Sequence, residues 1–258
     1  MPMLADQTVS ASPDFFGFER AQCDLPYYRG GAGGFGLTSV FVVFCATAGA
    51  FAVLMKAQQS FHSGLAGFIP PLLFVLIPLI AVAVVAGPAA PLALFRRLGL
   101  RDIGIILLFF VLNFILTVVV GLVVSGLFHS VANPAGDMVA SASQVDRILF
   151  FGWTAVQILG EEVFTILIFL GSMALLVRVM SRKLALCVAA LVASVIFGLV
   201  HLPTYQWNMP QAFGLMPIRI VLLLPYIITR NIWTSTGVHI LNDWAIFGSS
   251  ALSAMDAG

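Results

Sequence analysis

Apolar stretches about twenty residues long recur along this chain, and they constrain its fold more than any other feature. The hydrocarbon core of a bilayer is about 30 Å thick and needs about 20 apolar residues in a helix to cross it. Alternation of apolar and polar residues over about ten positions, the pattern of a membrane β-barrel, is absent from the sequence. The sequence therefore predicts an all-α, polytopic transmembrane helical bundle of about seven spans, at residues 37–55, 67–87, 103–128, 148–180, 184–201, 218–229 and 232–254.

Two of these stretches depart from a simple span. Stretch 67–87 contains Pro70, Pro71 and Pro78, which predict an irregular start or a kink because proline cannot donate a helical hydrogen bond. Stretch 148–180 is too long for one straight crossing, so we expect it to be tilted or broken.

The composition supports a membrane protein and excludes several other classes. The chain has 258 residues, of which 60% are hydrophobic and 9% charged, and its net charge is +1. Soluble domains carry about 25% charged residues. No basic surface is available for nucleic acid, so we expect the lipid bilayer, and no nucleic acid, as a partner. Three widely spaced cysteines form neither a disulfide framework nor a zinc-ribbon pattern.

The distribution of basic residues predicts the domain layout and the orientation. Residues 1–36 form a polar, flexible N-terminal tail without the pattern of a cleavable signal peptide, and residues 37–144 form the N-terminal transmembrane helices. Loops 129–146 and 202–217 carry no Lys or Arg. By the positive-inside rule the N-terminus is cytoplasmic and the C-terminus outside, with Lys56, Arg147 and Arg219 as exceptions. We expect a multi-pass integral protein of the plasma membrane.

Five ionisable residues fall inside or at the end of apolar stretches of the C-terminal half. They are two acidic neighbours, one further acid and two histidines: Glu161, Glu162, Asp243, His201 and His239. A charged residue at the bilayer centre costs about 2.5–3.5 kcal/mol on insertion scales, and such residues usually face a polar interior. A glutamate pair at a helix end, or a single histidine at a helix end, would need no functional explanation. It is a poor explanation, however, that all five ionisable residues occur in apolar stretches by chance.

Helical spacing brings these residues towards one another. The glutamate pair lies about twenty residues before the basic turn at 181–183, and His201 lies about eighteen residues after it. At 1.5 Å per residue the two positions have the same depth on adjacent antiparallel helices. His239 and Asp243 are four positions apart and share a helix face, with Asn242 beside it. The pattern predicts one shared site.

These residues resemble the motifs of the CPBP (CAAX protease and bacteriocin-processing, or Abi) family of intramembrane proteases. The family pattern is a Glu-Glu pair followed four residues later by Arg, then Phe-x-x-x-His, then His-x-x-x-Asn or Asp. This chain has Glu161-Glu162, then Phe197 to His201, then His239 to Asp243. The resemblance covers about residues 145–250 and identifies residues 145–254 as a CPBP-like catalytic helical core.

The resemblance implies that the chain hydrolyses a peptide bond of a membrane-associated peptide or protein with a glutamate-activated water. Glu161 or Glu162 would be the base, with a slight preference for Glu161, and His201 would position or share the water. His239 and Asn242 would donate hydrogen bonds to the oxyanion, and Asp243 would orient His239.

One position departs from the family pattern. The arginine of the first motif is replaced by Ile166, so the sequence offers the two carboxylates no nearby cation. Two adjacent carboxylates in an apolar site do not both stay ionised, so we expect one of them to hold a proton.

Three alternatives stay open at this point. A divalent metal such as zinc could be held by Glu161, His201, His239 and Asp243, although no cofactor is certain and no His-Glu-x-x-His motif occurs. A non-catalytic member of the same fold could serve as an immunity protein or scaffold. A proton-coupled transporter could also use buried acids and histidines, although here they all lie in one half of the chain.

Overall fold

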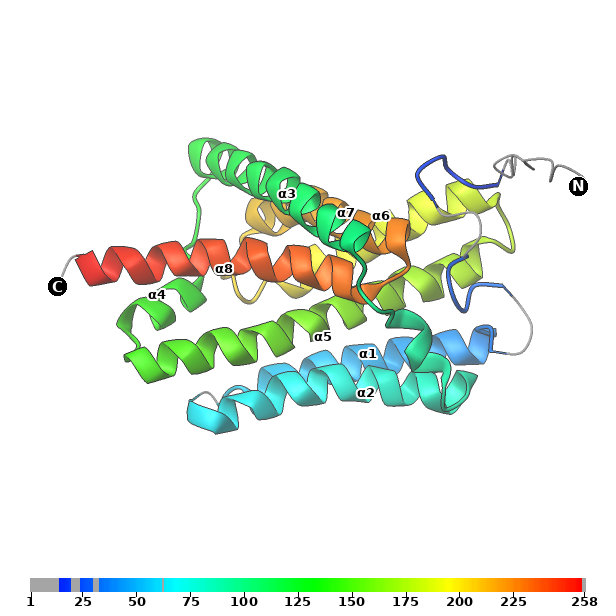
Figure 1. Cartoon of the computed structure of the whole chain (residues 1–258), viewed down its shortest axis with the longest axis horizontal. Coiled ribbons are helices and arrows are strands. Elements are labelled where there is room, and N and C mark those ends of the chain that lie inside the picture. The colour runs from blue at the N-terminus through cyan, green and yellow to red at the C-terminus, as the bar shows by residue number, and fades with distance from the viewer. Residues whose placement is uncertain (1–13, 20–23, 30–32, 62, 257–258) are drawn as a thin grey trace, which may run out of the picture.

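The computed structural model describes residues 14–19, 24–29, 33–61 and 63–256. Within these ranges every regular element is a helix, which confirms the predicted helical bundle (Figure 1). The eight α-helices are α1 (Leu37–Ala57), α2 (Ile69–Ala86), α3 (Leu100–Leu127), α4 (Pro134–Ser141), α5 (Gln144–Leu176), α6 (Arg182–Val200), α7 (Met209–Thr229) and α8 (Ile232–Asp256). Two short 3₁₀ turns, η1 (Gly64–Phe68) and η2 (Ala90–Leu94), precede and follow α2.

Six of these helices are long and apolar enough to cross a membrane: α1, η1 with α2, α3, α5, α6 and α7. The seventh predicted stretch forms α8, which is also long but is less apolar because it carries buried polar side chains such as Thr236, His239 and Asn242. The proline-rich start of the second stretch is the turn η1, and the long fourth stretch is one unbroken helix of 33 residues. Helix α4 lies in a segment that the sequence suggested as a loop.

Helix α5 is the centre of the bundle. In an apolar segment of 18 residues within α5, 83% of the residues are buried, whereas the share in the corresponding segment of α3 is only 6%. It packs against α1, α2, α6 and α8, and Figure 1 shows these helices on both sides of it. Apolar side chains of α1, α2, α5, α6 and α7 form the main core cluster. Polar groups of α5 are therefore shielded from lipid by its neighbours.

Two glycines allow close helix packing next to predicted site residues. A Cβ atom at Gly160 would lie 2.5 Å from a ring carbon of Phe74 in α2. A Cβ atom at Gly198 would lie 2.6 Å from the carbonyl oxygen of Ala212 in α7. Each glycine adjoins a motif residue, so the motif segments lie where α5 meets α2 and where α6 meets α7.

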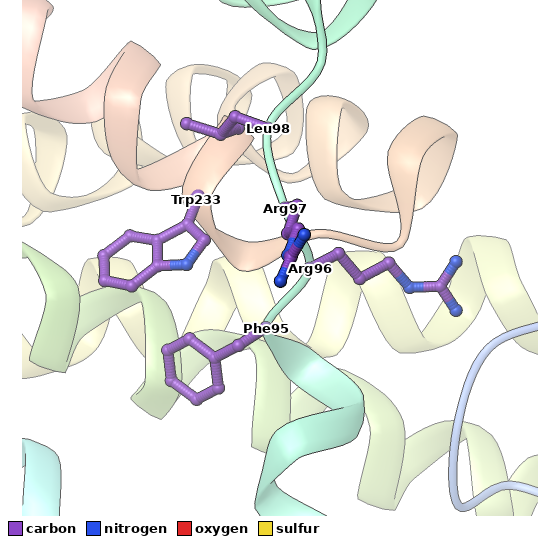
Figure 2. Close-up of a pocket in the computed structure, with 5 residues that line it drawn as sticks. All are labelled: Phe95, Arg96, Arg97, Leu98 and Trp233. Atoms are coloured by element: carbon purple, nitrogen blue, oxygen red, sulfur yellow. The ribbon is translucent and has the colours of Figure 1, made fainter.

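The connection from α2 to α3 runs past the joint between α7 and α8 (Figure 2). The Asn231 side chain accepts a hydrogen bond from the Arg96 backbone amide at 3.2 Å and donates one to the Arg96 carbonyl at 3.1 Å. Beside this clamp, the rings of Phe95 and Trp233 lie 5.4 Å apart between centroids. The joint itself turns at Arg230, which has a positive φ of 58°.

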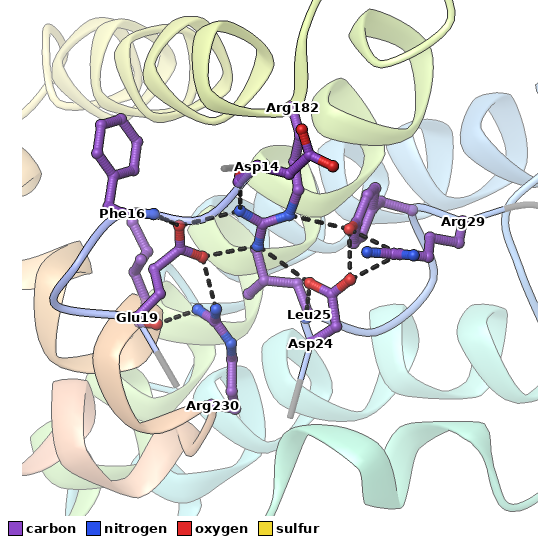
Figure 3. A network of polar contacts seen from close by, with 10 residues as sticks. Asp14, Phe16, Glu19, Asp24, Leu25, Arg29, Arg182 and Arg230 are labelled. Atoms are coloured by element: carbon purple, nitrogen blue, oxygen red, sulfur yellow. Dashed lines mark hydrogen bonds and ion pairs between the residues drawn. The ribbon is translucent and has the colours of Figure 1, made fainter. Parts of the chain in front are cut away.

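The described stretches of the predicted N-terminal tail are packed on the same end of the bundle (Figure 3). The buried Glu19 carboxylate accepts hydrogen bonds from Arg182, at the start of α6, and from Arg230, at 2.6 and 2.7 Å. Arg182 also binds Asp24, and its guanidinium lies 3.9 Å from the Phe15 ring centroid. A set of ion pairs thus ties this segment to two helix ends. Residues 1–13, 20–23 and 30–32 of the predicted tail lie outside the described ranges. The domain boundaries drawn from the sequence stay a prediction.

The Glu19 network predicts a pH-dependent contribution to stability. Burial raises the pKa of Glu19, but hydrogen bonds from Arg182, the Phe16 amide and Arg230 outweigh this and hold the pKa below its usual value. The stabilisation is therefore present above the unfolded pKa of about 4.5 and is lost as pH falls through the lower folded pKa. We expect Glu19→Gln to lower the melting temperature of the purified protein at pH 7, and we expect the difference from the wild type to shrink as the pH falls through the folded pKa.

Asp14→Asn is the matched control, because this exposed carboxylate is not part of the ion-pair network. Removing one partner of a buried pair costs about 3–5 kcal/mol. An unchanged melting temperature for Glu19→Gln at pH 7 would contradict the prediction.

The fold also makes the orientation testable. The N-terminal segment, the start of α6 and the α2–α3 connection meet at one end through Arg182, Arg230 and Asn231, and that end is predicted to be cytoplasmic. In a background without native cysteines, we expect Ala132→Cys to react with a membrane-impermeant maleimide in intact cells. Leu98→Cys at the other end should react only after permeabilisation. The reverse pattern of labelling would invert the orientation.

Candidate functional site

A buried ion pair between α5 and α7 forms the base of the site. Both oxygens of Glu162 accept hydrogen bonds from the Arg219 guanidinium, at 2.6 and 2.7 Å, and both side chains are completely buried. Such a two-point contact fixes the carboxylate in position and orientation. The expectation that the glutamate pair lacks a cation is therefore wrong. Position 166 is a buried isoleucine, but Arg219 provides the charge from another helix.

This ion pair also changes the expected protonation. The prediction that one glutamate holds a proton depended on two adjacent carboxylates without a counter-charge. With Arg219 bound to both of its oxygens, Glu162 has the partner that stabilises a carboxylate. The physical reason given for the extra proton therefore no longer applies.

His239 of α8 links the ion pair to the rest of the site. Its Nδ1 lies 2.8 Å from a Glu162 oxygen, and since that carboxylate is paired with Arg219, the Nδ1–H donates. The opposite ring nitrogen, Nε2, lies 3.9 Å from Glu161 Oε2 and 3.6 Å from Asp243 Oδ2. Glu162 thus fixes the His239 ring so that Nε2 faces two further carboxylates.

The two adjacent glutamates have different environments. Glu162 points into the core, whereas the Glu161 side chain keeps 17% of its exposure. Gln157, one turn earlier, donates a hydrogen bond to Glu161 Oε1 at 3.2 Å, and Gln58 at the end of α1 donates to Gln157 at 2.8 Å. Oε1 is thereby held, and Oε2 is the oxygen directed towards His239.

His201 lies at the rim of this cluster. Its Nδ1–H donates to the Phe197 carbonyl at 2.7 Å, because a carbonyl oxygen can only accept, which leaves the lone pair of the neutral ring on Nε2. The Phe197 ring lies 4.4 Å from the His201 ring, 6.3 Å from the His239 ring and 4.9 Å from the Arg219 guanidinium carbon. Within the described residues, His201 has no hydrogen bond to either glutamate. The motif phenylalanine separates it from the ion pair.

Asn242 contacts both Asp243 and α3. The Asn242 amide donates to Asp243 Oδ1 at 3.2 Å, and the Asn242 carbonyl oxygen accepts from Thr117 at 3.3 Å. This arrangement uses one of the two N–H donors of the amide that was predicted to serve the oxyanion. It leaves Asp243 Oδ2 facing His239, as expected for a residue that orients the ring.

Several polar residues of the site were not predicted from sequence: Arg219, Gln157, Thr117 and Tyr205. Arg219 left a signal, since it is a basic residue inside the predicted apolar stretch 218–229, and the loop before that stretch has no basic residue. Tyr205 follows His201 by four residues in the loop before α7. Partial burial, together with the negative charges of Asp243 and Glu161, raises the pKa of Tyr205 to about 12. Its phenol therefore stays protonated and can donate a hydrogen bond near both acids.

Within the described residues, no group of three or more His, Cys, Asp or Glu side chains meets the geometry of a formed metal site. His201 and His239 use Nδ1 for protein contacts, which leaves Nε2 of each ring available, and this arrangement is typical of histidines that bind a metal. The zinc ligands expected from the sequence, Glu161, His201, His239 and Asp243, therefore stay a prediction, and we derive no chemistry through a metal.

Comparison with family models gives a match to part of the chain. A family model described as "Type II CAAX prenyl endopeptidase Rce1-like" matches residues 143–245, which contain all three motifs. This match confirms the predicted resemblance to the CPBP family. No curated protein and no solved structure matches the chain.

The buried ion pair predicts a large effect for Arg219 on stability. We expect Arg219→Met to destabilise the protein by about 3–5 kcal/mol, because it leaves the Glu162 carboxylate unpaired in the core. Arg219→Lys keeps the charge but loses the two-point contact, so its effect should be smaller. Thermal unfolding in detergent measures both variants.

Two further variants control this experiment. The double variant Glu162→Met/Arg219→Met removes both charges and should regain much of the lost stability, whereas Arg101→Met, at an exposed arginine, should have no effect. Equal losses in the single and double variants would show that Arg219 contributes through packing alone.

Proposed function

We propose, from the premise that residues 143–245 belong to the Rce1-like type II CAAX prenyl endopeptidase family, that this protein is an intramembrane endopeptidase. It would cleave a peptide bond of a membrane-associated peptide or protein with a water molecule activated by Glu161. The observation that carries this proposal is the position of His239 Nε2, which faces the partly exposed Glu161 on one side and Asp243 on the other.

Glu161 is the better candidate for the base. Glu162 already accepts two hydrogen bonds from Arg219 and one from His239, so most of its acceptor capacity is used. Glu161 has one oxygen held by Gln157 and the other directed towards His239, and it is the more exposed of the two acids. A general base must reach both solvent and substrate, and only Glu161 of the pair meets that requirement.

The proposed reaction conserves atoms and protons. Glu161 accepts a proton from water, and the hydroxide attacks the carbonyl carbon to give a tetrahedral oxyanion. The C–N bond then breaks as the amine nitrogen receives a proton from Glu161 or from the His239 imidazolium. Glu162 and Arg219 do not react in this scheme, and their role is to hold His239.

The oxyanion needs hydrogen-bond donors at the rim of the site. The Tyr205 hydroxyl is our first candidate, because its phenol lies close enough to Asp243 and Glu161 to sense their charges. The imidazolium form of His201 is the second, because in the neutral ring Nε2 carries a lone pair and cannot donate. The Asn242 amide, predicted for this role from the family pattern, donates one N–H to Asp243 and keeps a second N–H that could serve the oxyanion.

The family match supports a prenylated C-terminal peptide as the first substrate to test. Bacteriocin leaders and other membrane peptides are the alternatives within the same chemistry. We place the protein in the plasma membrane, as the sequence predicted.

Cleavage of a farnesylated CAAX peptide by the protein in proteoliposomes tests the proposal. We expect Glu161→Gln to lower kcat by at least about 100-fold, and His239→Asn to have a similar effect, because general acid–base groups contribute about 10²–10⁴-fold. Asp137→Asn, at an exposed acid of α4, is the matched control. Wild-type cleavage rates in Glu161→Gln would refute its role as the base.

The same preparation distinguishes the rival functions. Loss of proton-driven flux in Glu161→Gln, without peptide cleavage in the wild type, would identify a transporter. Protection of cells against a peptide toxin that survives Glu161→Gln would identify a non-catalytic scaffold. Cleavage that persists after exhaustive chelation, in protein without metal by elemental analysis, would exclude the zinc mechanism.

A further inference from the structure

A pocket that none of the motif residues lines lies between the α2–α3 connection and the start of α8. Its volume is about 440 Å³, and it is open to the outside. Figure 2 shows Phe95 and Trp233 on one side of it and Arg96 and Arg97 on the other. No acidic side chain is among the described residues that line it. The pocket therefore combines two guanidinium groups with an aromatic wall.

The backbone of this pocket is fixed, although its arginine side chains are exposed. Asn231 holds the Arg96 peptide through two hydrogen bonds, at 3.2 and 3.1 Å. Arg97 makes no hydrogen bond or ion pair with the described residues, so its five N–H donors are available. A preorganised backbone with an unpaired guanidinium is suited to binding an anion, because little ordering is needed on binding.

The surroundings of the pocket indicate where that anion comes from. Leu92, Leu98 and Leu100 on the same connection are 68%, 48% and 89% exposed. Helix α3 follows directly, and apolar side chains such as Leu107 and Leu108 on it are exposed. Exposed leucines beside arginines and a tryptophan are typical of a segment at the level of the lipid headgroups. An acyl chain can then lie along α3 while its headgroup reaches the arginines.

We propose that this pocket binds the phosphate of an anionic phospholipid, with Arg96 and Arg97 on the phosphate oxygens and Phe95 and Trp233 against the glycerol region. Guanidinium groups match phosphate oxygens in two-point contacts. Basic pockets beside membrane helices are also the sites where anionic headgroups bind. Since Trp233 belongs to α8 and lies less than two turns before His239, an occupied pocket would brace the helix that carries the site histidine.

Binding of dioctanoyl phosphatidylglycerol to the detergent-solubilised full chain, measured by native mass spectrometry, tests this proposal. We expect the wild type to bind it at least tenfold more tightly than dioctanoyl phosphatidylcholine, and Arg96→Gln/Arg97→Gln to lose that preference. Arg101→Gln is the matched control, because this exposed arginine lies four residues further on and does not line the pocket. Arg97→Gln alone should give an intermediate loss with an unchanged melting temperature in the absence of lipid.

Three results would overturn the proposal. One is equal binding of the two lipids by the wild type, and another is an unchanged preference in a double variant that still melts as the wild type does. The third is competition by inorganic phosphate at the concentration of the lipid, which would assign the pocket to free phosphate instead of a phospholipid.

Discussion

The ion pair between Glu162 and Arg219 is the interaction on which the rest of the site depends. It places opposite charges where neither could remain alone, and His239 completes the contact from a third helix. A buried pair of this kind adds little net stability compared with apolar residues of the same size, but losing one partner is costly. Its main effect is on geometry. Helices α5, α7 and α8 can pack in only one register that satisfies all three side chains.

This constraint explains why two adjacent glutamates differ so strongly. Neighbouring positions on a helix point about 100° apart, so one of them can face the core while the other faces a gap between helices. Glu162 faces Arg219, and Glu161 faces Gln157 and the open side of His239. The same offset separates Asn242, which contacts α3, from Asp243, which faces the histidine. Paired residues in these motifs therefore have different tasks.

Apolar periodicity predicted the helices well, because a bilayer imposes nearly the same length on every span. The motif residues were also found from sequence, since ionisable side chains are conspicuous in apolar stretches. Arg219 was misjudged as a topological exception. Its partner is 57 residues away, and only the packing of α7 against α5 reveals the pair. The docking of Glu19 was missed for the same reason, because Arg230 is 211 residues further on.

His201 shows a different limit of sequence reasoning. Its predicted depth followed from residue counting, and the fold does place it at the end of α6. Counting could not reveal that the Phe197 ring lies between this histidine and the ion pair. The position of the Phe197 ring depends on how α6 packs against α7, and the two helices approach closely at the neighbouring Gly198.

The distance along the chain between Glu162 and Arg219 also bears on how the protein is made. During synthesis the acid enters the membrane long before its partner, and each charge alone costs about 2.5–3.5 kcal/mol on insertion scales. An ionised Glu162 in the hairpin of α5 and α6 carries that cost until α7 brings Arg219 beside it. Insertion of α7 and pairing of the two charges are therefore coupled in free energy. A chain interrupted before Arg219 would leave the Glu162 carboxylate without this partner.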